Sequence, residues 1–220
     1  TPSRHLAHDV PGDVTVQAFV APDGEQLRLL VRVPLEAMRD FVFPQRGPGY
    51  LDLDSADSML RDAIMVWVGD ELQLYEDDRR LTDQQLRAVR VSLPSDRSFV
   101  SYDQALSHVT GQPLPADTEI VWQQAMLDAL FEYSIRSEES QFSVNPTLGR
   151  LGIRTITVLR FVLPDGTVRA FEYSGNPGLV RLDPRWHQAA FRFVALGFEH
   201  ILDGIDHLLF LVCLVIPFRR

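Results

Sequence analysis

Five ionisable side chains stand close together in an otherwise apolar stretch near the C-terminus. Glu199, His200, Asp203, Asp206 and His207 fall within nine consecutive positions. Imidazole and carboxylate groups bind nickel, zinc, cobalt and copper, and the order of affinities among these metals does not select one of them. The pattern therefore indicates a site for a divalent transition metal or a path for protons.

A helix through this stretch would hold only part of a metal site. His200 and His207 would lie on one face but two turns apart, about 10.5 Å along the axis. Asp203 follows His200 by three positions and precedes His207 by four, so these three side chains could form a compact trio. Asp206 would be rotated by about 100° from His207, where it would face another helix or orient a ligand. We expect Gly204 to allow close approach of a neighbouring helix.

The flanking residues are apolar enough to place this helix in a membrane. Residues 189–218 would form a helix of about 45 Å, longer than the ~30 Å hydrocarbon core of a bilayer. Arg219 and Arg220 follow directly, and arginines beside a span favour the cytoplasmic side. We expect residues 186–220 to form the first transmembrane helix of a longer membrane domain in the cell membrane. The end at Arg220 would then be cytoplasmic, and residues 1–185 would be extracytoplasmic.

Structural pairing between helices is the alternative explanation for these polar groups. Each charged group costs roughly 2.5–3.5 kcal/mol at the bilayer centre on insertion scales. Five ionisable residues at one depth exceed what helix packing requires, so a metal or proton role is favoured over structural pairing.

Residues 1–185 predict a mainly β domain of the α+β class. Alternating apolar residues predict one hairpin around Pro22-Asp23-Gly24 and a second around Pro164-Asp165-Gly166. These patterns indicate a sandwich-like architecture, either as one domain or as two units, residues 1–115 and 116–185.

One amphipathic helix is expected to pack on this sheet. Asp54 or Ser55 would cap its N-terminus, and its apolar face would continue to about Val68. Alternation also predicts strands over residues 86–93 and 127–133, and residues 102–109 suit a short helix.

Composition and motifs argue against several functions. The formal net charge of −9 opposes a nucleic-acid partner, which needs clustered cations. Residues 1–185 contain no cysteine and none of the common motifs of nucleophilic, metalloprotease or phosphate-binding enzymes, so an enzyme is unsupported. His108 and His187 are interpreted as isolated surface or packing residues.

Residues 197–211 resemble the HupE/UreJ family of hydrogenase and urease accessory membrane proteins, in the subgroup that has a sizeable extracytoplasmic domain. The family pattern H-x-x-x-G-x-D-H maps onto His200, Gly204, Asp206 and His207 without a gap. Residues 161–173 and 178–184 also look like the lead-in of that subgroup to its membrane part.

The resemblance implies a membrane protein associated with nickel uptake, although zinc, cobalt and copper stay open. His200, Asp203, Asp206 and His207 are the candidate metal-site residues, and further transmembrane helices would complete the site. The alternative function is a membrane-anchored extracytoplasmic module that binds a protein partner, with a structural polar helix.

Overall fold

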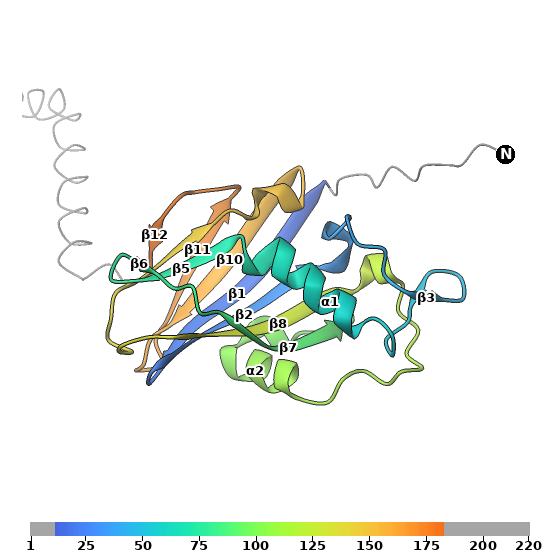
Figure 1. The fold of residues 1–220 in the computed structure, drawn as a ribbon, viewed down its shortest axis with the longest axis horizontal. Coiled ribbons are helices and arrows are strands. Elements are labelled where there is room, and N and C mark those ends of the chain that lie inside the picture. The colour runs from blue at the N-terminus through green and yellow to red at the C-terminus, as the bar shows by residue number, and fades with distance from the viewer. Residues whose placement is uncertain (1–11, 183–220) are drawn as a thin grey trace, which may run out of the picture. The chain divides into compact units, whose positions relative to one another are not determined.

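A six-stranded sheet forms the centre of the computed structural model, which describes residues 12–182 (Figure 1). These residues belong to one compact unit. The strands follow the order β11-β10-β1-β2-β8-β7. They are β1 (Asp13–Asp23), β2 (Gln26–Pro34), β7 (Gln85–Ser92), β8 (Met126–Ser134), β10 (Arg154–Val162) and β11 (Val168–Ser174).

Both predicted hairpins are confirmed. β1 pairs with β2, and β10 pairs with β11, each in the antiparallel sense. The turns place Gly24 at φ +60° and Gly166 at φ +83°, a region that glycine adopts without a steric penalty. The glycine of each Pro-Asp-Gly turn therefore suits the positive φ that the backbone adopts at that position.

The two hairpins are joined in a way that the sequence did not indicate. β1 and β10 run parallel, with Asp13 opposite Arg154 and Val20 opposite Phe161. β8 comes from the segment 116–185 and lies between β2 and β7 from the segment 1–115, so both segments contribute to one sheet. The boundary predicted at residues 185/186 lies outside the described residues and stays a prediction.

A second sheet shares the hydrophobic core on one face of the large sheet. It has the order β12-β9-β5-β6. Its strands are β5 (Leu72–Glu76), β6 (Arg79–Arg80), β9 (Phe142–Pro146) and β12 (Val180–Arg181), and a separate short pair is formed by β3 (Gln45–Arg46) and β4 (Tyr50–Leu51). Leu74 and Val144 of the second sheet belong to the same buried cluster as Val16 and Leu29 of the first. The mainly β class is confirmed, and a helix packs into this core as predicted, whereas the sandwich-like architecture stays a prediction.

That helix is α1 (Asp57–Ile64), which continues as a π-helical turn, Met65–Gly69. Its apolar side chains join the core, as the periodicity predicted. The predicted cap is wrong, because the N-cap residue is Ala56 and no side-chain capping hydrogen bond is formed. The Ser55 hydroxyl instead donates to the Asp52 carboxylate at 2.5 Å.

A second helix, α2 (Tyr102–Thr110), packs on the opposite face of the large sheet (Figure 1). Ala105 and Val109 contact a small cluster that includes Phe19, Leu30 and Leu130. The sequence anticipated the helix but only one packed helix overall, so this is a correction. Short 3-10 turns complete the connections, at Leu35–Ala37, Ser98–Val100, Trp122–Gln124 and Leu148–Leu151.

No helix among residues 12–182 has both the length and the hydrophobicity to cross a bilayer. The transmembrane helix predicted for residues 186–220 lies outside the described part of the chain.

Candidate functional site

The metal-site residues predicted from the sequence lie outside the part of the chain that the structure describes. His200, Asp203, Gly204, Asp206 and His207 all fall after residue 182, so their arrangement stays a prediction. Within residues 12–182, no three histidine, cysteine, aspartate or glutamate side chains gather as metal ligands would.

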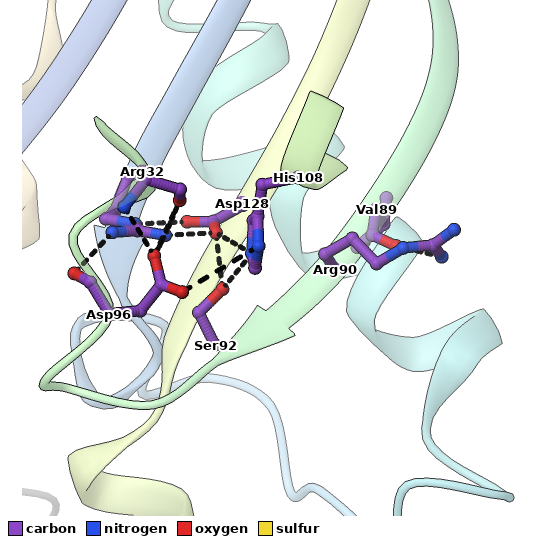
Figure 2. A network of polar contacts seen from close by, with 8 residues as sticks. Arg32, Val89, Arg90, Ser92, Asp96, His108 and Asp128 are labelled. Carbon is purple, nitrogen blue, oxygen red and sulfur yellow. Dashed lines mark hydrogen bonds and ion pairs between the residues drawn. The ribbon is translucent and has the colours of Figure 1, made fainter. Parts of the chain in front are cut away.

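A buried ion pair forms the centre of a polar network on the large sheet (Figure 2). Arg32 on β2 lies directly opposite Asp128 on β8. Arg32 Nε donates to Asp128 Oδ1 and Nη2 donates to Oδ2, both at 2.6 Å. Arg32 is 3% exposed and Asp128 is 0% exposed. This two-point contact compensates for the loss of water around both charges.

Asp96, in the loop after β7, supplies a second carboxylate to the same guanidinium. Arg32 Nη2 donates to Asp96 Oδ1 at 2.8 Å, and Arg32 Nη1 donates to its backbone carbonyl at 3.0 Å. Burial would raise the pKa of Asp96, but hydrogen bonds from Ser98 and Arg32 lower it to about 2. The Arg32 guanidinium also lies 4.3 Å from the centre of the Phe99 ring, a favourable cation–π arrangement.

His108 reaches this network from the last turn of α2. Its Nε2 lies 2.7 Å from Ser92 Oγ and 3.2 Å from Asp128 Oδ2, and its Nδ1 lies 3.8 Å from Asp96 Oδ2. The hydrogen bond with Asp128 raises the pKa of His108, burial lowers it, and the charge of Asp96 adds to the increase, so the net change is upward. The interpretation of His108 as an isolated residue is therefore wrong.

The Ser92, His108 and Asp96 side chains have the residue types of a hydrolytic triad, but not its chemistry. Ser92 is 1% exposed, which leaves its hydroxyl no access to a substrate. Ser92 Oγ also donates its hydrogen to Asp128 Oδ2, so His108 cannot withdraw that hydrogen as a general base would. The arrangement is suited to holding charges and a proton rather than to nucleophilic attack.

Part of this network was visible in the strand patterns. Arg28 and Arg32 share one face of β2 with a spacing of four, and Asp128 and Glu132 share one face of β8 with the same spacing. The antiparallel register places Arg28 opposite Glu132 and Arg32 opposite Asp128. The equal four-residue spacing of the arginines on β2 and the acidic residues on β8 could have predicted these pairs, but only if β2 and β8 were known to be neighbours.

A small hollow of about 130 Å³ lies beside the N-terminus of α1. Asp54, Asp57 and Arg90 contribute polar groups to its wall, among apolar neighbours. Arg90 is engaged with its surroundings, because it donates to the backbone carbonyls of Val89 and Gly111. The volume is below the roughly 300–1,000 Å³ of ordinary ligand pockets, so the hollow does not define a ligand site.

Residues 178–220 match a protein family described as HupE / UreJ protein. The match begins just before β12 and contains the complete motif from His200 to His207. The family resemblance of this segment is therefore confirmed, and at the family level HupE/UreJ proteins are metal-related accessory proteins of membranes. A search among curated proteins finds no match to the chain.

Proposed function

We propose that this chain is part of a membrane protein that binds or transports a divalent transition metal ion as its substrate. The observation that carries the proposal is the match of residues 178–220 to the HupE/UreJ family, in the segment that contains the closely spaced His and Asp residues. Nickel is the leading substrate because of the family resemblance, with zinc, cobalt and copper as chemically acceptable alternatives.

The proposed ligands are His200 and His207, and Asp203 stands between them in the helical register. Asp206 acts as a further ligand or holds a ligand imidazole in orientation through a hydrogen bond. Gly204 gives a second helix room to approach, and that helix supplies the remaining ligands. The proposal is also supported by the cost of placing these groups in a bilayer, which is roughly 2.5–3.5 kcal/mol for each charge on insertion scales.

The domain formed by residues 12–182 is proposed to lie on the extracytoplasmic side of the cell membrane. The alternative function assigns the activity to this domain, as a module that binds an extracytoplasmic protein while the polar helix serves packing. Metal uptake separates the two functions, because only the first requires His200 and His207.

Uptake of nickel by cells that produce the full-length protein tests the proposal. We expect His200→Ala and His207→Ala to lower uptake by roughly 10–100-fold or more, because loss of even a ligand-orienting group has that effect on metal affinity. The matched control is His187→Ala, which changes a histidine in the same segment outside the motif and should leave uptake intact.

Parallel measurements with zinc, cobalt and copper identify the substrate. If both motif variants transport every metal like the unmodified protein at equal membrane abundance, the ligand assignment is wrong. In that case retention of a protein partner by the full-length chain would favour the binding module.

A further inference from the structure

The charges of the polar network beneath α2 sum to zero only when the His108 imidazole is protonated on both nitrogens and therefore positively charged. Asp96 and Asp128 supply two negative charges, and Arg32 supplies one positive charge. The described polar groups that face the imidazole come from four segments of the domain. Asp128 lies on β8, Ser92 on β7, Asp96 in the following loop and Arg32 on β2.

Two further charged groups, one on β7 and one on α2, do not alter that balance. Arg90 on β7 points away from the network, as Figure 2 shows, and donates to the Gly111 carbonyl at the helix C-terminus. Asp103 lies in the first turn of α2, at the other end of the helix. His108 itself lies in the last turn, where the negative end of the helix dipole favours a cation.

The hydrogen bonds identify which nitrogen of His108 gains and loses the proton. Ser92 donates its one hydroxyl hydrogen to Asp128 Oδ2. His108 Nε2 must therefore carry a hydrogen in order to bond with Ser92 Oγ. The remaining nitrogen, Nδ1, faces Asp96 Oδ2 at 3.8 Å. Protonation at Nδ1 consequently creates an ion pair between α2 and the loop after β7.

We propose that His108 is a proton-operated latch that fastens α2 to the large sheet in acidic surroundings and releases it as the pH rises. When Nδ1 is protonated, the helix is tied to both Asp96 and Asp128, and the network has no net charge. When Nδ1 is not protonated, the hydrogen bond to Ser92 remains. The network then has one uncompensated negative charge beside the partly buried neutral imidazole.

The pKa of His108 is raised in the folded protein. The upward direction means that folding favours the protonated imidazole, as the proposed latch requires. A histidine whose pKa is higher in the folded protein stabilises the fold fully below its ordinary pKa of 6.5. That stabilisation is lost as the pH rises through the higher value of the folded state. The latch therefore loosens as the pH rises above 6.5 and through the raised pKa of the folded state.

Release of α2 would alter the surface that the domain presents. The helix covers Phe19, Leu30 and Leu130 on the outer face of the sheet. An apolar patch covered in one state and accessible in another is a means by which proton concentration changes what a surface binds.

Hydrogen–deuterium exchange of the full-length protein in detergent tests the latch. Amide protection in α2 is compared at about pH 5.5 and about pH 8.5, on either side of the histidine range, after correction for intrinsic exchange rates. We expect the protection of residues 102–110 to fall roughly twofold to fivefold at the higher pH, the size of effect given by loss of a partly exposed ion pair. Protection of α1, which packs in the other hydrophobic cluster, should fall less than that of α2.

In His108→Gln, which keeps a hydrogen-bonding side chain but does not titrate, α2 should show the same protection at both pH values. An unchanged α2 in the unmodified protein overturns the latch, whether or not the variant folds. An equal loss of protection in the variant also overturns it, because the titrating group would then lie elsewhere.

Discussion

The buried guanidinium of Arg32 shows how one side chain can organise a surface of the domain. It bonds to Asp128 across the strands and to Asp96 in a loop, and it stacks on Phe99. The outward position of Arg32 and Asp128 follows from strand alternation. The contributions of Asp96 and His108 could not be inferred in this way, because a loop and a separate helix bring them in and no fixed sequence spacing records that approach.

Removal of the Asp128 charge should be far more damaging than removal of the neighbouring Glu132 charge. Asp128→Asn leaves the Arg32 guanidinium buried without its two-point partner, and we expect the free energy of unfolding to fall by about 3–5 kcal/mol. Glu132→Gln is the matched control on the same strand, because its partners Arg28 and Arg87 are partly exposed. There we expect a loss of at most about 1 kcal/mol.

Denaturant unfolding of both variants measures the difference. Equal losses in the two variants would contradict the assignment of Arg32–Asp128 as the buried centre of the network.

The loop that connects β8 to β9 is likewise held in place by a residue that is distant in the sequence. Glu76, the last residue of β5, is 1% exposed. Its Oε1 accepts hydrogen bonds from the backbone N–H groups of Arg136 and Ser137 and from the Ser140 hydroxyl. Burial would raise the pKa of Glu76, but Arg79 and these donors lower it. The buried anchor of this connection comes from a strand about 60 residues earlier.

Glu76→Gln should loosen this connection and weaken the fold. Loss of the anionic acceptor is expected to lower the free energy of unfolding by about 1.5–3 kcal/mol at neutral pH. Because the pKa of Glu76 is lowered from 4.5, its contribution exists above that pH and disappears on further acidification.

The difference between Glu76→Gln and the unmodified protein should therefore shrink at about pH 3, as measured by thermal unfolding. Glu139→Gln, in the exposed part of the same turn, is the control and should change little. A Glu76 effect that is the same at both pH values would refute the assignment.

At the scale of the whole molecule, the sequence indicated most local elements and the family of the C-terminal segment, but not how the sheets assemble. Hairpins, α1 and α2 follow from alternation, turn residues and helical periodicity. The parallel contact between β1 and β10 joins residues more than 130 positions apart, and no local pattern encodes it. The predicted metal ligands belong to the motif from His200 to His207, which lies outside residues 12–182, and they stay a prediction.

The free energy of unfolding of the domain should fall both at acidic and at alkaline pH. Asp96, with a pKa of about 2 in place of 3.8, contributes fully above pH 3.8 and loses its contribution as the pH falls toward 2. His108 contributes fully below pH 6.5 and loses its contribution above it. We therefore expect these two groups to give a maximum of stability between about pH 4 and 6.5.

Urea midpoints across the pH range measure this profile. His108→Gln should flatten the alkaline decline while the acid decline remains. A profile in which His108→Gln leaves the alkaline decline intact would contradict the contribution assigned to this histidine.

The parallel pairing of β1 with β10 also has a consequence for the order of events during synthesis on the ribosome. β1 is an interior strand, yet one of its two neighbours is made only when residues 154–161 have been translated. Until then one side of β1 presents unpaired backbone groups, the kind of open edge that recruits other chains. The sheet therefore closes late, shortly before residues 178–220, which match the HupE/UreJ family, are synthesised.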